Sequence, residues 1–227
     1  MRQIALDFGP APAPTFGNYL PGRNLAAVAA LRELAAGRSE HRSVYLWGPA
    51  GVGRSHLLHA LEAALPPGTA RWLDTAAGAR AFEFDAGVHA YLIDDVDRLG
   101  ATAQEAAFHL LNRIAAVPSA CWVASGAAPP RGLELREDLR TRIGAALVFE
   151  LLPLDDAGKA RALADAFEAR GLSVGAGVVE FLLARLPRDL GTLGAAVQAL
   201  DRLSLEKKRA VTVALLREFM KISDSEP

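Results

Sequence analysis

Five short apolar runs alternate with stretches of helical periodicity between residues 43 and 151. The runs are SVYLW (43–47), ARWLD (70–74), HAYLID (89–94), ACWVAS (120–125) and ALVFEL (146–151). Each run is bounded by turn residues or by a helix-period stretch, and this alternation predicts a parallel sheet with helical crossovers. We therefore expect an α/β domain over residues 23–153.

From Asp155 onward the pattern is wholly helical. Apolar residues recur at three- and four-residue steps, with Gly171 and Pro187 as stops. The sequence thus predicts a small all-helical domain over 154–222, followed by a tail over 223–227. A chain of 227 residues that is 51% apolar is long enough to bury both cores.

The residues before the α/β domain have a different composition from the rest of the chain. Residues 9–22, GPAPAPTFGNYLPG, are rich in proline and predict a stiff, extended linker leading into the α/β domain. Residues 1–8 then form a separate tether. Asn24 is expected to cap a helix that runs through about Ala36 and ends at Gly37.

Charge and cysteine content exclude several classes of protein. The 25 Lys and Arg residues against 26 Asp and Glu residues leave a net charge of -1, which excludes the basic composition of a protein that mainly binds nucleic-acid phosphates. The single cysteine, Cys121, cannot form an internal disulfide. With no signal-peptide pattern or apolar span, the chain is expected to be soluble and cytoplasmic.

A glycine-rich segment, GPAGVGRSH, follows the first apolar run. From Gly48 to Ser55 it has the frame G-x-x-x-x-G-K-S/T of a phosphate-binding loop, except that Arg54 replaces the lysine. Gly51 and Gly53 would let backbone N–H groups turn toward a phosphate, and Ser55 would hold Mg²⁺. The planar fork of Arg54 is not equivalent to a compact lysine. The alternative is a glycine-rich turn between a strand and a helix without a ligand.

Paired carboxylates end the third apolar run. In LIDDVDRL (92–99), Asp94 is expected to bind Mg²⁺ and Asp95 to orient a water molecule. The alternative is a solvated turn made by Asp94, Asp95 and Asp97.

These segments resemble successive motifs of the AAA+ ATPases of the DnaA group. Three further segments carry the resemblance: ASGAAPP after the fourth strand, DLRTRIGAAL, and RLPRDLGTLGAAVQALDRL. The chain is most similar to the Hda family of short DnaA homologues, over nearly its whole length, and GRSHLLHA is the most specific part. The resemblance implies a five-stranded Rossmann-like base, a helical lid, and a role in inactivating the replication initiator DnaA.

The resemblance also implies a site for ADP (or ATP) with Mg²⁺. Asp95 would be catalytic, and Ser55 and Asp94 would hold the metal. The implied nucleotide contacts are Leu20, Pro21, Gly48, Pro49, Ala50, Gly51, Val52, Gly53, Arg54, Ser55, His56 and the lid residue Arg188.

Arg142 in DLRTRI matches the arginine finger of the family. Such a finger offers a delocalised cation to the γ-phosphate of ATP bound by a neighbouring subunit. The alternative is a surface ion pair with Asp138, four residues earlier. Ala127 stands near the position where the family usually has a polar Asp or Asn sensor. Together with Arg54, it predicts that the chain hydrolyses nucleotide poorly by itself.

The N-terminal segment QIALDF resembles the peptide motif that binds bacterial sliding clamps, with Gln3, Leu6 and Phe8 as anchors. The alternative is an N-terminal arm that packs on its own domain. The implied partners are DnaA and the sliding clamp (β subunit) of DNA polymerase III. DNA would be reached mainly through the clamp, and no membrane is involved. AAA+ domains often self-associate, so a homodimer is a further candidate assembly.

Two other functions fit the sequence. One is a self-sufficient P-loop ATPase such as a helicase loader, and the other is an interaction module without chemistry. No helix-turn-helix segment follows the helical region up to Pro227, which argues against the initiator itself. His56 and His59 lie one helical turn apart but have no third metal ligand in register. Ser125 lacks the G-x-S-x-G frame of a hydrolase nucleophile.

Overall fold

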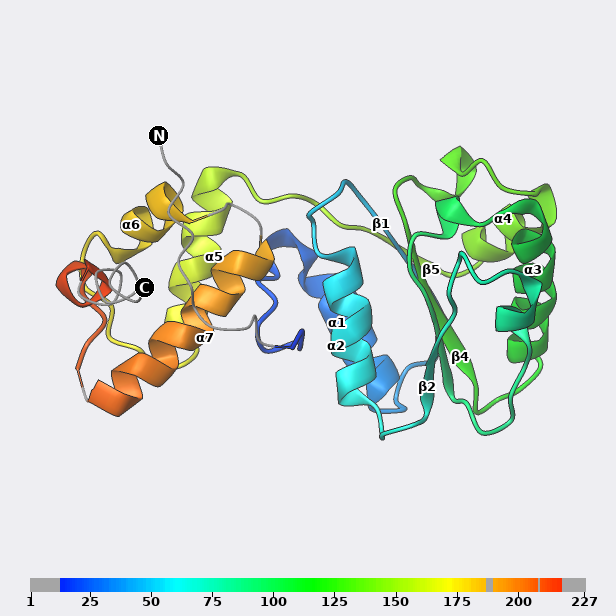
Figure 1. The fold of residues 1–227 in the computed structure, drawn as a ribbon, viewed down its shortest axis with the longest axis horizontal. Coiled ribbons are helices and arrows are strands. Elements are labelled where there is room, and N and C mark those ends of the chain that lie inside the picture. Colours follow the sequence, from blue (N-terminus) through cyan, green and yellow to red (C-terminus); the bar gives the residue numbers. More distant parts are fainter. Residues whose placement is uncertain (1–12, 187–189, 208, 218–227) are drawn as a thin grey trace, which may run out of the picture. The chain divides into compact units, whose positions relative to one another are not determined.

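The computed structural model describes residues 13–186, 190–207 and 209–217. The chain forms two compact units (Figure 1). The base unit holds residues 14–16 and 23–153, and the lid unit holds residues 17–22 and the chain from Leu154 onward. The change of unit after Pro153 falls where strand-like runs give way to helical periodicity.

The base unit is built on one five-stranded sheet in which every pairing is parallel. The strand order is β2-β3-β4-β1-β5, so β4 lies between β3 and β1. The predicted α/β fold class is confirmed, because each apolar run contains one strand. The strands are β1 (Ser43–Trp47), β2 (Ala70–Trp72), β3 (Ala90–Ile93), β4 (Cys121–Gly126) and β5 (Leu147–Glu150).

Helices cover both faces of this sheet, α1 and α2 on one side and α3 and α4 on the other (Figure 1). This arrangement explains why all four residues of β3 are buried and apolar. The helices are α1 (Leu25–Ala35), α2 (Arg54–Ala64), α3 (Ala101–Ala115) and α4 (Glu137–Gly144). Short 3-10 turns are η1 (Gly22–Asn24), η2 (Ala79–Phe82), η3 (Val96–Arg98) and η4 (Pro130–Gly132).

Asn24 precedes α1 as expected, but its side chain does not cap the helix. Instead, the side-chain amide donates to the carbonyl of Leu152 at 3.0 Å and accepts from the Leu152 N–H at 2.8 Å. Asn24 is only 3% exposed, so its amide needs internal partners. The two hydrogen bonds fasten the start of α1 to the chain that follows β5.

The lid unit is helical, as its periodicity predicts. Its helices are α5 (Asp156–Glu168), α6 (Val178–Arg185) and α7 (Leu190–Lys207), and residues 213–217 are also helical. Asp155 caps α5, since its side chain accepts from the N–H of Gly158 at 2.6 Å. Leucine, valine and phenylalanine side chains from these helices form a separate core around Leu163, Phe167 and Leu193.

The described part of the predicted linker is not extended. Asn18, Tyr19 and Leu20 are buried, and Leu20 belongs to the lid core. At Gly194 of α7, a Cβ atom would lie 2.2 Å from the carbonyl oxygen of Asn18. Residues 17–22 are therefore part of the lid, because burying their apolar side chains outweighs the extension that nearby prolines favour.

None of the helices in the described ranges is long and apolar enough to cross a membrane.

Candidate functional site

The loop between β1 and α2 has the backbone that a phosphate cradle requires. Gly51 and Gly53 adopt left-handed conformations, with φ of 78° and 94°. A Cβ atom at Gly48 would lie 2.5 Å from the carbonyl oxygen of Leu151. All three glycines of the motif are thus needed for the loop to take this path, and α2 begins directly after it at Arg54.

The remaining loop residues differ in exposure. Pro49, Ala50 and Ser55 are exposed, whereas Val52 is buried beneath the loop. Ser55 is thus accessible in the first turn of α2, where helical N–H groups favour anions.

The acidic pair lies at the carboxyl end of β3. The hydroxyl of Ser125, at the end of the neighbouring strand β4, donates to Oδ1 of Asp94. The same hydroxyl accepts from the N–H of Asp95 at 3.1 Å. Asp95 has a left-handed backbone, with φ of 50°, which is uncommon for a residue other than glycine. The turn at Asp94 and Asp95 is therefore hydrogen-bonded to β4, which differs from the alternative of a purely solvated turn.

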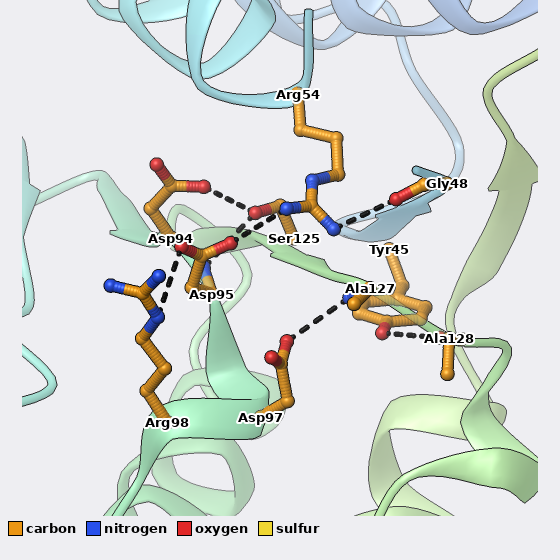
Figure 2. A network of polar contacts seen from close by, with 10 residues as sticks. All are labelled: Tyr45, Gly48, Arg54, Asp94, Asp95, Asp97, Arg98, Ser125, Ala127 and Ala128. Atoms are coloured by element: carbon orange, nitrogen blue, oxygen red, sulfur yellow. Dashed lines mark hydrogen bonds and ion pairs between the residues drawn. The ribbon is translucent and has the colours of Figure 1, made fainter. Parts of the chain in front are cut away.

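Arg54 joins the glycine loop to this acidic pair (Figure 2). Its Nη1 donates to the carbonyl of Gly48 at 2.8 Å, and its Nη2 donates to Oδ1 of Asp95 at 2.9 Å. The two side chains of the ion pair are 13% and 24% exposed. Arg98 approaches the other oxygen of Asp95 at 3.5 Å, but its side chain is 74% exposed. Asp95 thus faces two cations, and Arg54 is the better shielded.

Ala127, at the expected sensor position, contributes only its backbone to polar contacts. Its N–H donates to Oδ1 of Asp97 at 3.0 Å. Nearby, the Tyr45 hydroxyl donates to the carbonyl of Ala128 at 2.8 Å (Figure 2). Burial raises the pKa of the Tyr45 phenol, so it stays protonated as a donor. Asp97 is the acidic side chain that reaches the segment after β4.

His56 and His59 lie on α2 but have different partners. Nε2 of His56 is 3.0 Å from the carbonyl oxygen of Thr15. Burial lowers the pKa of His56, which favours the neutral ring. His59 packs on the ring of Trp72, with centroids 4.2 Å apart. The part of the chain that the structure describes has no cluster of three His, Cys, Asp or Glu residues that could hold a metal ion.

Arg142 lies on α4, and its Nη2 donates to the side-chain carbonyl of Asn112 on α3. The alternative ion pair with Asp138 is not formed, since Asp138 pairs with Arg136 at 2.9 Å. Arg142 also lines a hollow of about 780 Å³. The other lining residues are Phe108 of α3 and residues in or beside α4. The cation of Arg142 is therefore oriented by a neutral amide at the edge of an open depression.

Several predicted site residues are not part of this group. Gln3, Leu6, Phe8 and Arg188 lie outside the described residues. Leu20 and Pro21 belong to the lid unit, where Leu20 is 3% exposed in the core and Pro21 is half-buried.

The sequence reasoning missed the polar partners Ser125, Asn112 and Asp97. The pattern around Ser125 does not indicate a nucleophile, but a polar residue at the carboxyl end of a strand beside β3 is itself a signal for a partner of the acidic pair. Asn112 lies in an otherwise ordinary helix, and nothing in its local pattern signals its contact with Arg142.

Known structures share this fold. Domain III of the replication initiation protein DnaA from Thermotoga maritima is 23% identical, with a TM-score of 0.62 over 94% of this chain and 100% of that one. AMPPCP-bound DnaA from Aquifex aeolicus is 20% identical, with a TM-score of 0.65 over 87% of this chain and 70% of that one. A DNA replication initiation factor is 19% identical, with a TM-score of 0.62 over 86% of this chain. This chain spans 65% of the length of that protein.

The chain thus has the fold of these DnaA structures, and in this chain the fold carries the glycine loop and the acidic pair that faces it. The lid is more specific, because residues 156–220 match the family model of the lid domain of Hda. The match covers the lid alone, so it is the lid of this chain that is similar to the Hda family.

Proposed function

We propose that this protein is a negative regulator of replication initiation that stimulates ATP hydrolysis by the initiator DnaA. The orientation of Arg142 carries the proposal. Its guanidinium is held by the neutral amide of Asn112, so its charge is not cancelled by a carboxylate. Such a cation can stabilise the charge that develops on the γ-phosphate of ATP bound by a partner.

The base unit is suited to hold ADP or ATP. The left-handed glycines Gly51 and Gly53 let the loop present backbone N–H groups to phosphate oxygens. The Ser55 hydroxyl and the Asp94 carboxylate are oxygen donors of the kind that Mg²⁺ takes. When bound, Mg²⁺ would offset phosphate charge. A solved DnaA with the same fold is bound to AMPPCP, which supports a nucleotide in this chain.

Two features disfavour hydrolysis in the protein's own site. Asp95, the residue expected to orient water, is engaged by Arg54. Ala127 has no polar side chain to assist it. The chain thus serves as an activator of its partner and is a weak ATPase by itself.

Docking on the DNA-loaded sliding clamp would use Gln3, Leu6 and Phe8. This part of the proposal depends on the sequence motif, and it makes the contact with DNA indirect. The near-neutral charge of the chain agrees with that arrangement. A homodimer remains a candidate resting assembly.

Replacing Arg142 with alanine tests the proposal. Arginine fingers contribute about 10³–10⁵ in rate, so we expect Arg142→Ala to lower clamp-dependent hydrolysis of DnaA-bound ATP by at least about 10³-fold. Arg140→Ala is the matched control, because Arg140 lies on the same helix, two residues away. Undiminished hydrolysis with Arg142→Ala would contradict the proposed role.

The autonomous ATPase is the second candidate, because both carboxylates of the acidic pair are present. It predicts fast phosphate release from ATP by the purified protein without DnaA. Slow release without DnaA, together with rapid hydrolysis in its presence, would favour the regulator.

A further inference from the structure

Ser125 has no role in the function proposed above, yet its hydroxyl is the link between β4 and the acidic pair. It is a buried polar side chain with 0% exposure at the carboxyl end of β4. This end lies beside β3, since Ile93 of β3 is in register with Ala124 of β4. The hydroxyl therefore lies where the two residues after β3 begin to turn.

The acidic pair uses the proton of this hydroxyl and one of its two acceptor positions. Its one proton goes to Oδ1 of Asp94. Its oxygen accepts the N–H of Asp95 at 3.1 Å. A serine hydroxyl has a single proton to donate, so it cannot turn to another acceptor without giving up the Asp94 contact.

The contact with Asp94 restricts how that carboxylate can be used. Oδ1 accepts the serine proton, whereas Oδ2 has no hydrogen-bond partner among the described residues. The side-chain torsion of Asp94 is thereby fixed with one oxygen committed and one available. Metal-binding carboxylates are commonly held in this way by a hydrogen bond from a neighbouring group.

The contact with Asp95 fixes the backbone of the pair. The N–H of Asp95 would be costly to leave without a partner inside the protein, and the left-handed conformation at this residue is itself unfavourable. The Ser125 hydroxyl stabilises this conformation, in which the Asp95 carboxylate meets Arg54 (Figure 2).

We infer that Ser125 is a positioning residue for magnesium: its hydroxyl orients Asp94 for the Mg²⁺ that accompanies the nucleotide. The inference rests on the nucleotide-binding part of the proposed function. It assigns Ser125 no contact with the nucleotide and no chemical step.

The test is the Mg²⁺ dependence of nucleotide affinity in the full chain. A fluorescent ADP derivative is titrated with the protein at a series of Mg²⁺ concentrations and in EDTA. Loss of a hydrogen bond behind a metal ligand typically costs 10–100-fold in metal affinity, so Ser125→Ala should raise the Mg²⁺ concentration for half-maximal effect by about tenfold. Its affinity for the ADP derivative in EDTA should stay within about twofold of the wild-type value.

Tyr45→Phe is the matched control. It removes another buried hydroxyl beside the end of β4, but that hydroxyl donates to Ala128 and does not touch the acidic pair. We expect the wild-type Mg²⁺ dependence in this variant. A second control compares Asp94→Asn with the double variant Asp94→Asn, Ser125→Ala. The effect of Ser125 passes through Asp94, so the Mg²⁺ dependence of these two proteins should differ by less than about twofold.

The outcomes separate this inference from the function on which it rests. Unchanged Mg²⁺ dependence in Ser125→Ala, or an equal change in Tyr45→Phe, overturns the inference alone. Equal weakening in EDTA and in Mg²⁺ shows a general structural role and also overturns it. A wild-type protein that binds the ADP derivative without any Mg²⁺ effect overturns both the inference and the proposed metal site.

Discussion

Replacing Arg54 with lysine is expected to raise the protein's own rate of ATP hydrolysis. Arg54 bonds two groups at once, the Gly48 carbonyl through Nη1 and Asp95 through Nη2. Lysine has one ammonium on its stem and cannot reproduce this fork. In Arg54→Lys the ammonium stays available to the phosphate loop, while Asp95 is released to orient water.

The size of the effect follows from the strength of the lost contact. A hydrogen bond to a charged group contributes about 1.5–3 kcal/mol. The side chains of Arg54 and Asp95 are 13% and 24% exposed, so solvent weakens their interaction and the lower end of this range applies. About 1.5 kcal/mol corresponds to roughly tenfold in the fraction of molecules with Asp95 released. Intrinsic hydrolysis should therefore increase by about tenfold.

The assay is single-turnover hydrolysis of bound ATP by the purified protein, without DnaA or clamp. Arg98→Ala is the control, because Arg98 contacts the same carboxylate but is 74% exposed, and exposed pairs contribute little. Its rate should stay within about twofold of the wild-type rate. If Arg54→Lys binds ATP but hydrolyses it no faster than the wild type, the Arg54–Asp95 pair does not restrain hydrolysis.

Three further predictions concern stability. Asn24→Ala should lower the free energy of unfolding of the base unit by about 2–4 kcal/mol, as measured by urea denaturation. The substitution removes two hydrogen bonds and leaves the N–H and the carbonyl of Leu152 without that partner. Gly194→Ala should destabilise the lid by about 1–3 kcal/mol, as measured by amide exchange in α7. Alanine has the better helix propensity, but its Cβ would lie 2.2 Å from the carbonyl oxygen of Asn18. Burial lowers the pKa of His56 in the folded protein below 6.5, so the unfolded chain takes up the proton first as the pH falls. Stability should therefore decrease as the pH drops below about 6.5, and a shallower pH dependence of the urea midpoint in His56→Gln would confirm the source.

The three inner strands β1, β3 and β4 could be predicted from the sequence because the sheet is covered on both faces, whereas the edge strands β2 and β5 are only partly buried. Strands buried on both sides must be apolar almost throughout, and short continuous runs such as AYLI are then visible without any knowledge of their partners. The glycine loop was equally visible, since the left-handed backbone at Gly51 and Gly53 demands glycine itself.

The contacts of the site could not be predicted in the same way. Asn24 looks like a helix cap by its local pattern, yet its partner Leu152 is 128 residues away. Arg142 has a carboxylate four residues earlier, yet its partner is Asn112 on another helix. Local spacing identifies which groups could meet, but packing between distant segments decides which of them do.

The sequence by itself determined the layered fold of the base, the helical lid, the phosphate-type loop and the acidic pair, because these depend on local periodicity and on backbone conformations that only certain residues adopt. Only the tertiary structure decided that Arg54 engages Asp95 and that Ser125 supports both acidic residues. The physical reason is the strand order, because placing β4 between β3 and β1 brings together three segments that lie far apart along the chain.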